Sequence, residues 1–127
     1  LLVLSCGVEN SNKKQSSNSQ AVTLKDSVIA VHDEVMPKMS TLVNYNKQLN
    51  SIPKDSLSDT ANKRRKEIIK SLKDADEAMW NWMYQYDTEK ENDIQYLKQQ
   101  KISVNKMAEK INNSMSDAKN FLDNYDE

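Results

Sequence analysis

The scarcity of glycine and proline is the feature that most constrains the fold of this chain. Its 127 residues include one glycine, Gly7, and two prolines, Pro37 and Pro53. A β-sandwich or an α/β fold needs turns at short intervals, and such turns usually contain glycine, proline or an Asn-Gly pair. Because this punctuation is so sparse after Gly7, the sequence predicts an all-α fold in a single domain.

Composition and charge agree with long helices and argue against a nucleic-acid partner. Hydrophobic residues make up 37% of the chain and charged residues 29%, which is typical of amphipathic helices around a thin core. The formal net charge is -1, from 18 basic and 19 acidic residues. A nucleic-acid-binding protein usually carries a clustered basic excess. The basic run at residues 63–66 covers a single helical turn, and we interpret it as a solvated helix face.

The N-terminal segment resembles the lipobox of bacterial lipoproteins. Residues 1–4 are apolar, Ser5 is small, and Cys6 follows directly. The resemblance implies that residues 1–5 are the remnant of a lipoprotein signal peptide. It also implies that Cys6 carries acyl chains such as palmitate, since two or more chains give stable membrane anchoring. The alternative is an apolar stub with an incidental thiol; as the sole cysteine, Cys6 has no partner for an internal disulfide.

A flexible linker is predicted behind the cysteine, so that residues 6–22 form a lipidated tether. Residues 8–21 are almost entirely polar and cannot bury apolar surface. No later stretch approaches 18 consecutive apolar residues, so no transmembrane helix is expected. We therefore expect a protein of the bacterial cell envelope that is held to a membrane through Cys6 and faces the periplasm.

Three amphipathic helices are predicted, over residues 23–50, 58–87 and 89–124. Thr23 and Thr88 each begin a capping pattern with an acidic residue three positions later, so they are the expected starts of the first and third helices. Ser58 is the expected N-cap of the second helix, and Pro37 should kink the first. Short connections make consecutive helices antiparallel. The prediction is an elongated antiparallel three-helix bundle over residues 23–127 with coiled-coil-like packing.

Apolar residues recur at three- and four-residue steps in each predicted helix and form one inner stripe per helix. The first stripe comprises Val28, Val31, Val35, Met39, Leu42, Val43 and Leu49. The second comprises Ile68, Leu72, Ala75, Met79, Trp82, Met83 and Tyr86. The third comprises Ile94, Leu97, Val104, Ala108, Ile111, Met115, Ala118 and Leu122.

A histidine and four methionines are expected to converge between the first two helices. A hairpin centred near residue 54 places His32 opposite residue 77, close to the methionines of the second helix. The cluster comprises His32, Met36, Met39, Met79 and Met83. Thioethers and imidazole suit Cu(I) and Ag(I), so a soft-metal site is one interpretation. The other, which we favour, is core packing, because methionine fills irregular gaps around indole rings such as those of Trp80 and Trp82. Haem ligation is disfavoured because a thin core offers little room.

No enzyme active site is recognisable in the sequence. The chain has one histidine, His32, and lacks a phosphate-binding glycine loop, a Gly-x-Ser-x-Gly motif and a zinc-protease helix motif. The acidic run at residues 74–77 diverges around a helix, so we interpret it as a solvated face. We therefore expect a protein that is not an enzyme and has no cofactor, with Cu(I) as the alternative.

Two segments resemble a known family. They read His32-Asp33-Glu34-Val35-Met36-Pro37-Lys38-Met39 and Asp74-Ala75-Asp76-Glu77-Ala78-Met79-Trp80-Asn81-Trp82-Met83. Both are similar to segments of small helical lipoproteins of Bacteroidota-type bacteria, sometimes labelled viral A-type inclusion protein-like. The likeness covers most of residues 24–122 in layout, and only these two segments are specific. It implies a helical, lipid-anchored, envelope-facing protein and supplies no catalytic residue.

The expected function is therefore that of a structural or protein-binding module. Its expected contacts are a membrane, through the anchor, and another envelope protein. Outward-facing Tyr45, Trp80 and Tyr84 are candidate contact residues. Soft-metal binding is the alternative function.

Overall fold

The computed structural model describes the backbone of residues 8–125 and the side chains of residues 17–125. Residues 1–7 and 126–127 lie outside the described part of the chain. The predicted signal-peptide remnant and the predicted lipidation site, Cys6, both fall there. What the sequence indicates about them therefore stays a prediction.

The described chain is helical throughout, and no strand occurs between residues 8 and 125. Four α-helices are joined by short 3₁₀ turns, labelled η. The elements are α1 (Val8–Val35), η1 (Met36–Lys38), α2 (Met39–Ser51), η2 (Lys54–Ser56), α3 (Asp59–Gln85), η3 (Thr88–Lys90) and α4 (Ile94–Asn124). The predicted all-α fold is confirmed. None of these helices is long and apolar enough to cross a membrane.

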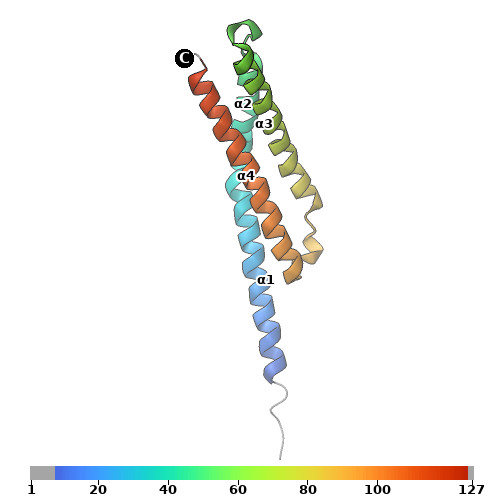
Figure 1. The fold of residues 1–127 in the computed structure, drawn as a ribbon. Helices are drawn as coiled ribbons and strands as arrows, with labels where there is room; N and C mark the ends of the chain where they lie inside the picture. The colour runs from blue at the N-terminus through green and yellow to red at the C-terminus, as the bar shows by residue number, and fades with distance from the viewer. Residues whose placement is uncertain (1–7, 126–127) are drawn as a thin grey trace, which may run out of the picture.

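The helices form an elongated three-helix bundle, as predicted. The α1, η1 and α2 elements run in one direction as a single arm, α3 returns antiparallel to it, and α4 reverses again (Figure 1). Helix α4 packs against α1, α2 and α3, with its most extensive contacts to α1 and α3. The α3–α4 turn therefore lies beside α1, while the α2–α3 turn lies beside the end of α4 (Figure 1).

The first helix begins earlier than the sequence indicated, at Val8 and not at Thr23. The Thr23 hydroxyl does not cap a helix start; it donates a hydrogen bond to the carbonyl of Ser19, one turn back, at 2.9 Å. Residues 17–20 are exposed, and Ala21 is the first buried side chain among those described. The packed part of α1 nucleates the helix, and adding residues to an existing helix is far easier than starting one.

Pro37 interrupts the long N-terminal arm. Helix α1 stops at Val35, η1 carries the proline, and α2 begins at Met39. Proline has no backbone N–H and clashes with the preceding helical turn, so the α-helical hydrogen bonding cannot run through it. The predicted kink is thus a short 3₁₀ segment. Val35 and Met39 on either side of it are both buried, so the break does not divide the core.

The α2–α3 turn is closed by a charged side chain. Ser58 caps α3 as predicted, with its hydroxyl accepting a hydrogen bond from the Ala61 N–H at 3.1 Å. Arg65 is only 9% exposed, and its guanidinium donates to the carbonyls of Leu49 at 3.2 Å and Ile52 at 2.9 Å. The interpretation of residues 63–66 as a solvated face is therefore wrong for Arg65. Its side chain is buried and donates hydrogen bonds to carbonyls at the C-terminal end of α2.

The α3–α4 turn differs from the predicted Thr88 capping box. Asp87 accepts from the Glu89 N–H at 2.9 Å and starts η3, while Asp93 accepts from the Tyr96 N–H at 3.1 Å and caps α4. The carboxylate of Glu91, which the capping box requires, instead accepts a hydrogen bond from the Tyr86 hydroxyl at 3.0 Å. The Tyr86–Glu91 hydrogen bond thus replaces the predicted Thr88 capping box, and α4 begins five residues later than expected, at Ile94.

The core is one continuous cluster that runs along the bundle. Its members are Val28, Val35, Met39, Leu42, Leu49, Ile52, Ile68, Leu72, Ala75, Met79, Trp82, Val104, Met107, Ile111 and Ala118. Two residues assigned to the inner stripes are exposed, Val43 at 43% and Met83 at 37%. Met83 follows Trp82, which takes the inward position, and each residue turns a helix by about 100°. Buried Met107 and Ser114 were missed by the sequence pattern.

Candidate functional site

The centre of the candidate site is the stack of His32 on Trp82. Their ring centroids lie 5.7 Å apart with an interplanar angle of 29°. The contact joins α1 to α3 in an antiparallel register in which residue 32 lies opposite residue 82. The predicted register, with His32 opposite residue 77, is therefore displaced by more than one helical turn.

The His32 ring is oriented by a carboxylate and leaves one nitrogen unused. Nδ1 lies 3.1 Å from Oδ1 of Asp33. A carboxylate only accepts hydrogen bonds, so Nδ1 carries the proton in the neutral ring and Nε2 holds a free lone pair. Nε2 is buried and has no hydrogen-bond partner among the described residues. The same is true of Nε1 of Trp82, which is a donor only.

The methionines of the predicted cluster divide into two groups. Met39 and Met79 are core residues with 7% and 0% exposure, and Met36 packs against that core. Met83 is 37% exposed, so its assignment to the inner stripe is wrong. The buried group belongs to the same core cluster as Trp82.

Aromatic rings continue the stack into the α3–α4 turn. Tyr86 lies 5.1 Å from Trp82 and 6.1 Å from Tyr96 between ring centroids. The Asp87 N–H donates to the Tyr96 hydroxyl at 2.6 Å. Burial raises the pKa of the Tyr86 hydroxyl, and its hydrogen bond to Glu91 raises it further. This network, which holds Trp82 in place, was missed because its members are separated by the turn.

A second feature is an apolar surface on the outer face of α3. Trp80 is 49% exposed, Met83 is 37% exposed and Tyr84 is 92% exposed. The three lie within one helical turn of one another, and we call them the outer patch. Tyr84 faces outward as the sequence predicted. Tyr45, the third predicted contact residue, is partly buried against the core and belongs to a different surface.

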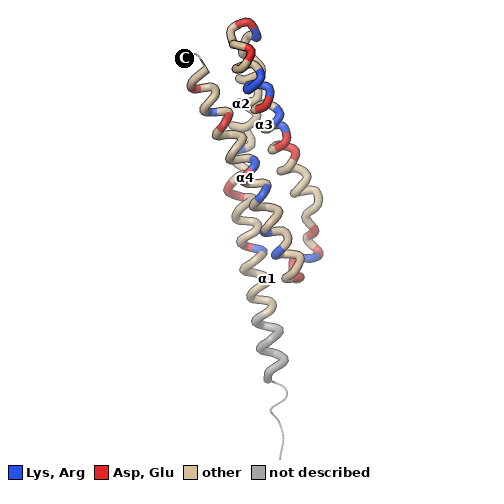
Figure 2. The backbone as a smooth tube through the Cα atoms, viewed as in Figure 1, with Lys and Arg blue, Asp and Glu red and all other residues tan. Residues whose placement is uncertain are grey.

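Acidic residues border the outer patch at both ends. Asp76 and Glu77 precede it by one turn, and Asp87 and Glu89 follow it. Figure 2 shows an uncharged stretch near the end of α3 with acidic positions, in red, on either side of it. The Trp80 indole N–H donates to Oδ1 of Asp76 at 3.3 Å, which ties the indole to the acidic border.

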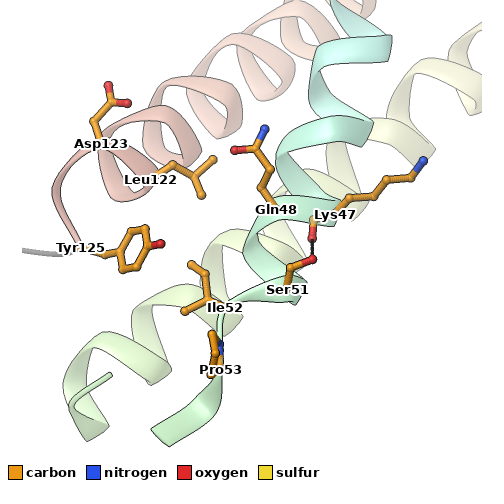
Figure 3. A pocket seen from close by; sticks show the side chains of 8 residues that line it. All are labelled: Lys47, Gln48, Ser51, Ile52, Pro53, Leu122, Asp123 and Tyr125. Carbon is orange, nitrogen blue, oxygen red and sulfur yellow. Dashed lines mark hydrogen bonds between the residues drawn. The ribbon is translucent and has the colours of Figure 1, made fainter. Parts of the chain in front are cut away.

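Two surface hollows lie elsewhere on the described part of the chain. The largest that is described, about 460 Å³, lies between the ends of α2 and α4. In Figure 3 the side chains of Ile52, Leu122 and Tyr125 surround it. Asp123, at its edge, is engaged by Lys119 at 2.7 Å. A smaller groove of about 270 Å³ between α3 and α4 is floored by Trp82 and Met107.

The described part of the chain holds no group of three or more His, Cys, Asp or Glu side chains arranged to bind a metal ion. In comparisons with protein-family models, curated proteins and solved structures, no match to this chain was found.

Proposed function

We propose that this protein is a non-enzymatic, lipid-anchored module of the bacterial cell envelope that binds another envelope protein through the outer patch. The observation that carries the proposal is the exposure of Trp80, Met83 and Tyr84 together on one face of α3. The bundle buries a continuous core elsewhere, so these side chains are not needed to complete it. Tryptophan and tyrosine are also the residues that contribute most to protein interfaces.

The acidic border defines the chemistry of the partner. Asp76, Glu77, Asp87 and Glu89 favour a segment whose apolar residues are flanked by lysine or arginine. An amphipathic helix of this kind lays its apolar side on the indole and phenol rings while its basic residues meet the carboxylates. The same border disfavours contact with an anionic lipid surface.

The anchor is the second part of the proposal. The segment that ends at Cys6 supports it, because diacylation of a cysteine in such a position gives stable membrane attachment. Intact-protein mass spectrometry of the membrane fraction should show the mass of the acyl chains on a chain that begins at Cys6. The Cys6→Ser variant should lose that mass and leave the membrane fraction. An unmodified Cys6 in membrane-bound protein would refute the anchor without touching the outer patch.

A designed peptide tests the outer patch. We suggest isothermal titration of the full chain with an amphipathic helical peptide of leucine and lysine, and with a peptide of identical pattern in which glutamate replaces lysine. The lysine peptide should bind, and Trp80→Ser or Tyr84→Ser should weaken it at least about tenfold, which equals roughly 1.4 kcal/mol.

The control is Ile102→Ser on α4, where an apolar side chain is 54% exposed outside the outer patch. This variant should bind as the unaltered protein does. Equal binding by all three variants, or equal binding of the glutamate peptide, would contradict the proposed contact surface.

A further inference from the structure

We propose that His32, Met36 and Met79 form a binding site for a soft monovalent cation, Cu(I) or its analogue Ag(I), beside the ring of Trp82. The inference is independent of the outer patch and goes beyond the proposed function. Three observations carry it: an unused imidazole nitrogen, a helix register that places two methionines one turn from the ring stack, and a donor set that selects the ion.

The first observation is the buried Nε2 of His32. The ring cannot turn freely, because Asp33 holds Nδ1 and Trp82 stacks on its face. Metal-binding histidines typically donate their other ring N–H to a carboxylate, which fixes the tautomer and raises the basicity of the ligating nitrogen. His32 has this arrangement, with its lone pair directed into the protein and lacking a partner there.

The second observation is the register set by the ring stack. Met36 follows His32 by four residues, and Met79 precedes Trp82 by three. Residues three or four apart lie on the same helix face, one turn away. Because α1 and α3 are antiparallel, both steps lead toward the same end of the bundle. We therefore expect both methionines in the layer next to the ring stack; Met79 is fully buried and Met36 packs against the core.

The Pro37 break contributes to this layer. Met36 is the first residue of η1, at the point where α-helical hydrogen bonding gives way to a 3₁₀ turn. A thioether on three rotatable bonds at such a break can adjust its direction more readily than one inside a regular helix.

The third observation is the donor set. One imidazole and two thioethers are neutral, soft ligands, which select Cu(I) over hard divalent cations. Divalent oxygen-ligand cations require several convergent oxygens, whereas the carboxylate that contacts the His32 ring, that of Asp33, is 68% exposed.

The test is a Cu(I) competition titration with a chromophoric chelator under reducing conditions. The full chain should carry Cys6→Ser, because a free thiol would itself bind Cu(I). One equivalent should bind. His32→Phe, which keeps an aromatic ring against Trp82, and Met79→Leu, which keeps the core volume, should each lower the affinity at least about tenfold. Asp33→Ala should also lower it roughly tenfold, as loss of an orienting partner does.

Two methionines serve as matched controls. Met83→Leu changes the exposed methionine next to Trp82, and Met115→Leu changes one on α4. Neither should alter Cu(I) affinity. Circular dichroism melting of each metal-free variant separates loss of the site from loss of the fold.

A spectroscopic readout locates the ion. In protein with ¹³C-labelled methionine methyl groups, one equivalent of Ag(I) should shift the signals of Met36 and Met79 and leave that of Met83 unchanged. In a Trp80→Phe background, Ag(I) should quench the fluorescence of Trp82. The proposal is overturned if His32→Phe binds Cu(I) as tightly as the parent, if the Met83 signal moves instead, if Zn(II) binds equally well, or if no ion binds.

Discussion

At the scale of single residues, Arg65 shows how one buried charge closes a turn. The final carbonyls of a helix lack partners within it, and they form the negative end of the helix dipole. The guanidinium of Arg65 donates to the carbonyls of Leu49 and Ile52 at that end of α2. Its charge is thereby compensated, which explains how an arginine can be 91% removed from solvent in a thin bundle, given its 9% exposure.

Removing this side chain should unfold the protein at a lower denaturant concentration. We expect Arg65→Ala to reduce the free energy of unfolding by about 2–3 kcal/mol, since hydrogen bonds from charged groups contribute about 1.5–3 kcal/mol. Arg64→Ala, one position earlier and about half exposed, should change it by less than about 0.5 kcal/mol. Urea denaturation followed by circular dichroism measures both. Equal effects would show that the two carbonyls do not need Arg65.

Tyr86 predicts a pH dependence of stability. Burial and the Glu91 carboxylate raise the pKa of its hydroxyl above the ordinary value of 10.0, so the folded state holds the proton more tightly than the unfolded chain. Stability from this group is complete below pH 10 and is lost as the pH rises above that value. The free energy of unfolding should therefore fall less steeply between pH 9.5 and about 11 in Tyr86→Phe than in the unaltered protein.

The control for this prediction is Tyr84→Phe, which removes the hydroxyl of a 92% exposed tyrosine. Its alkaline slope should match that of the unaltered protein in the same denaturation series. If both variants lost the slope to the same degree, the raised pKa of Tyr86 would not be its cause.

Residue-scale roles were only partly predictable from the sequence. The 3.6-residue period identified Met79 and Trp82 as inward-facing, because it reports the direction in which a helical side chain points. It did not identify the partner of a polar atom. The bonds of Arg65 and the stack of His32 on Trp82 join different helices, and their geometry depends on how the elements pack.

At the scale of elements, helix ends were predicted well where only local interactions decide them. Ser58 caps α3 as expected, since its hydroxyl meets no competing partner. The predicted start of α4 was wrong because the Glu91 carboxylate accepts a hydrogen bond from the Tyr86 hydroxyl across the turn. The predicted start of α1 was wrong because the polar residues before Thr23 extend a helix that packing has already nucleated.

The revised start of α4 is testable by comparing two caps. Asp93→Ala should reduce the free energy of unfolding by about 1 kcal/mol, because it removes the acceptor for the Tyr96 N–H at the first turn of the helix. Thr88→Ala, at the position that the sequence favoured, should cost less than about 0.5 kcal/mol. Thermal and urea unfolding of both variants decides between them. A larger effect at Thr88 would restore the capping box.

At the scale of the whole molecule, α4 unites the bundle because it packs against every other α-helix of the described chain. Two isoleucines on this helix allow a matched comparison. Ile111 is fully buried and Ile102 is 54% exposed. Ile111→Ala should lower the free energy of unfolding by about 2–5 kcal/mol through lost transfer energy and a cavity.

Ile102→Ala removes the same atoms from a solvent-exposed site. It should shift the free energy of unfolding by about 0.5 kcal/mol or less. Denaturant midpoints measure both changes, and similar losses would mean that α4 does not form the core in the way described.

The architecture was predictable because helix content, stripe direction and short connections follow from local sequence. The candidate site was less so. A register error of just over one turn moved the partner of His32 from residue 77 to Trp82, and the exposed position of Met83 removed a presumed ligand. Such errors arise because the Pro37 break and the two turns set the register of α1 against α3. The hydrophobic periodicity of the sequence does not reveal the geometry of these breaks.

The central place of α4 has a consequence for biogenesis. This helix follows all the other described elements in the chain, and until it is synthesised, the apolar sides of α1 and α3 lack the neighbour that covers them. Cooperative closure of the bundle must therefore wait until synthesis has passed α4. Until then the nascent polypeptide is without a closed core.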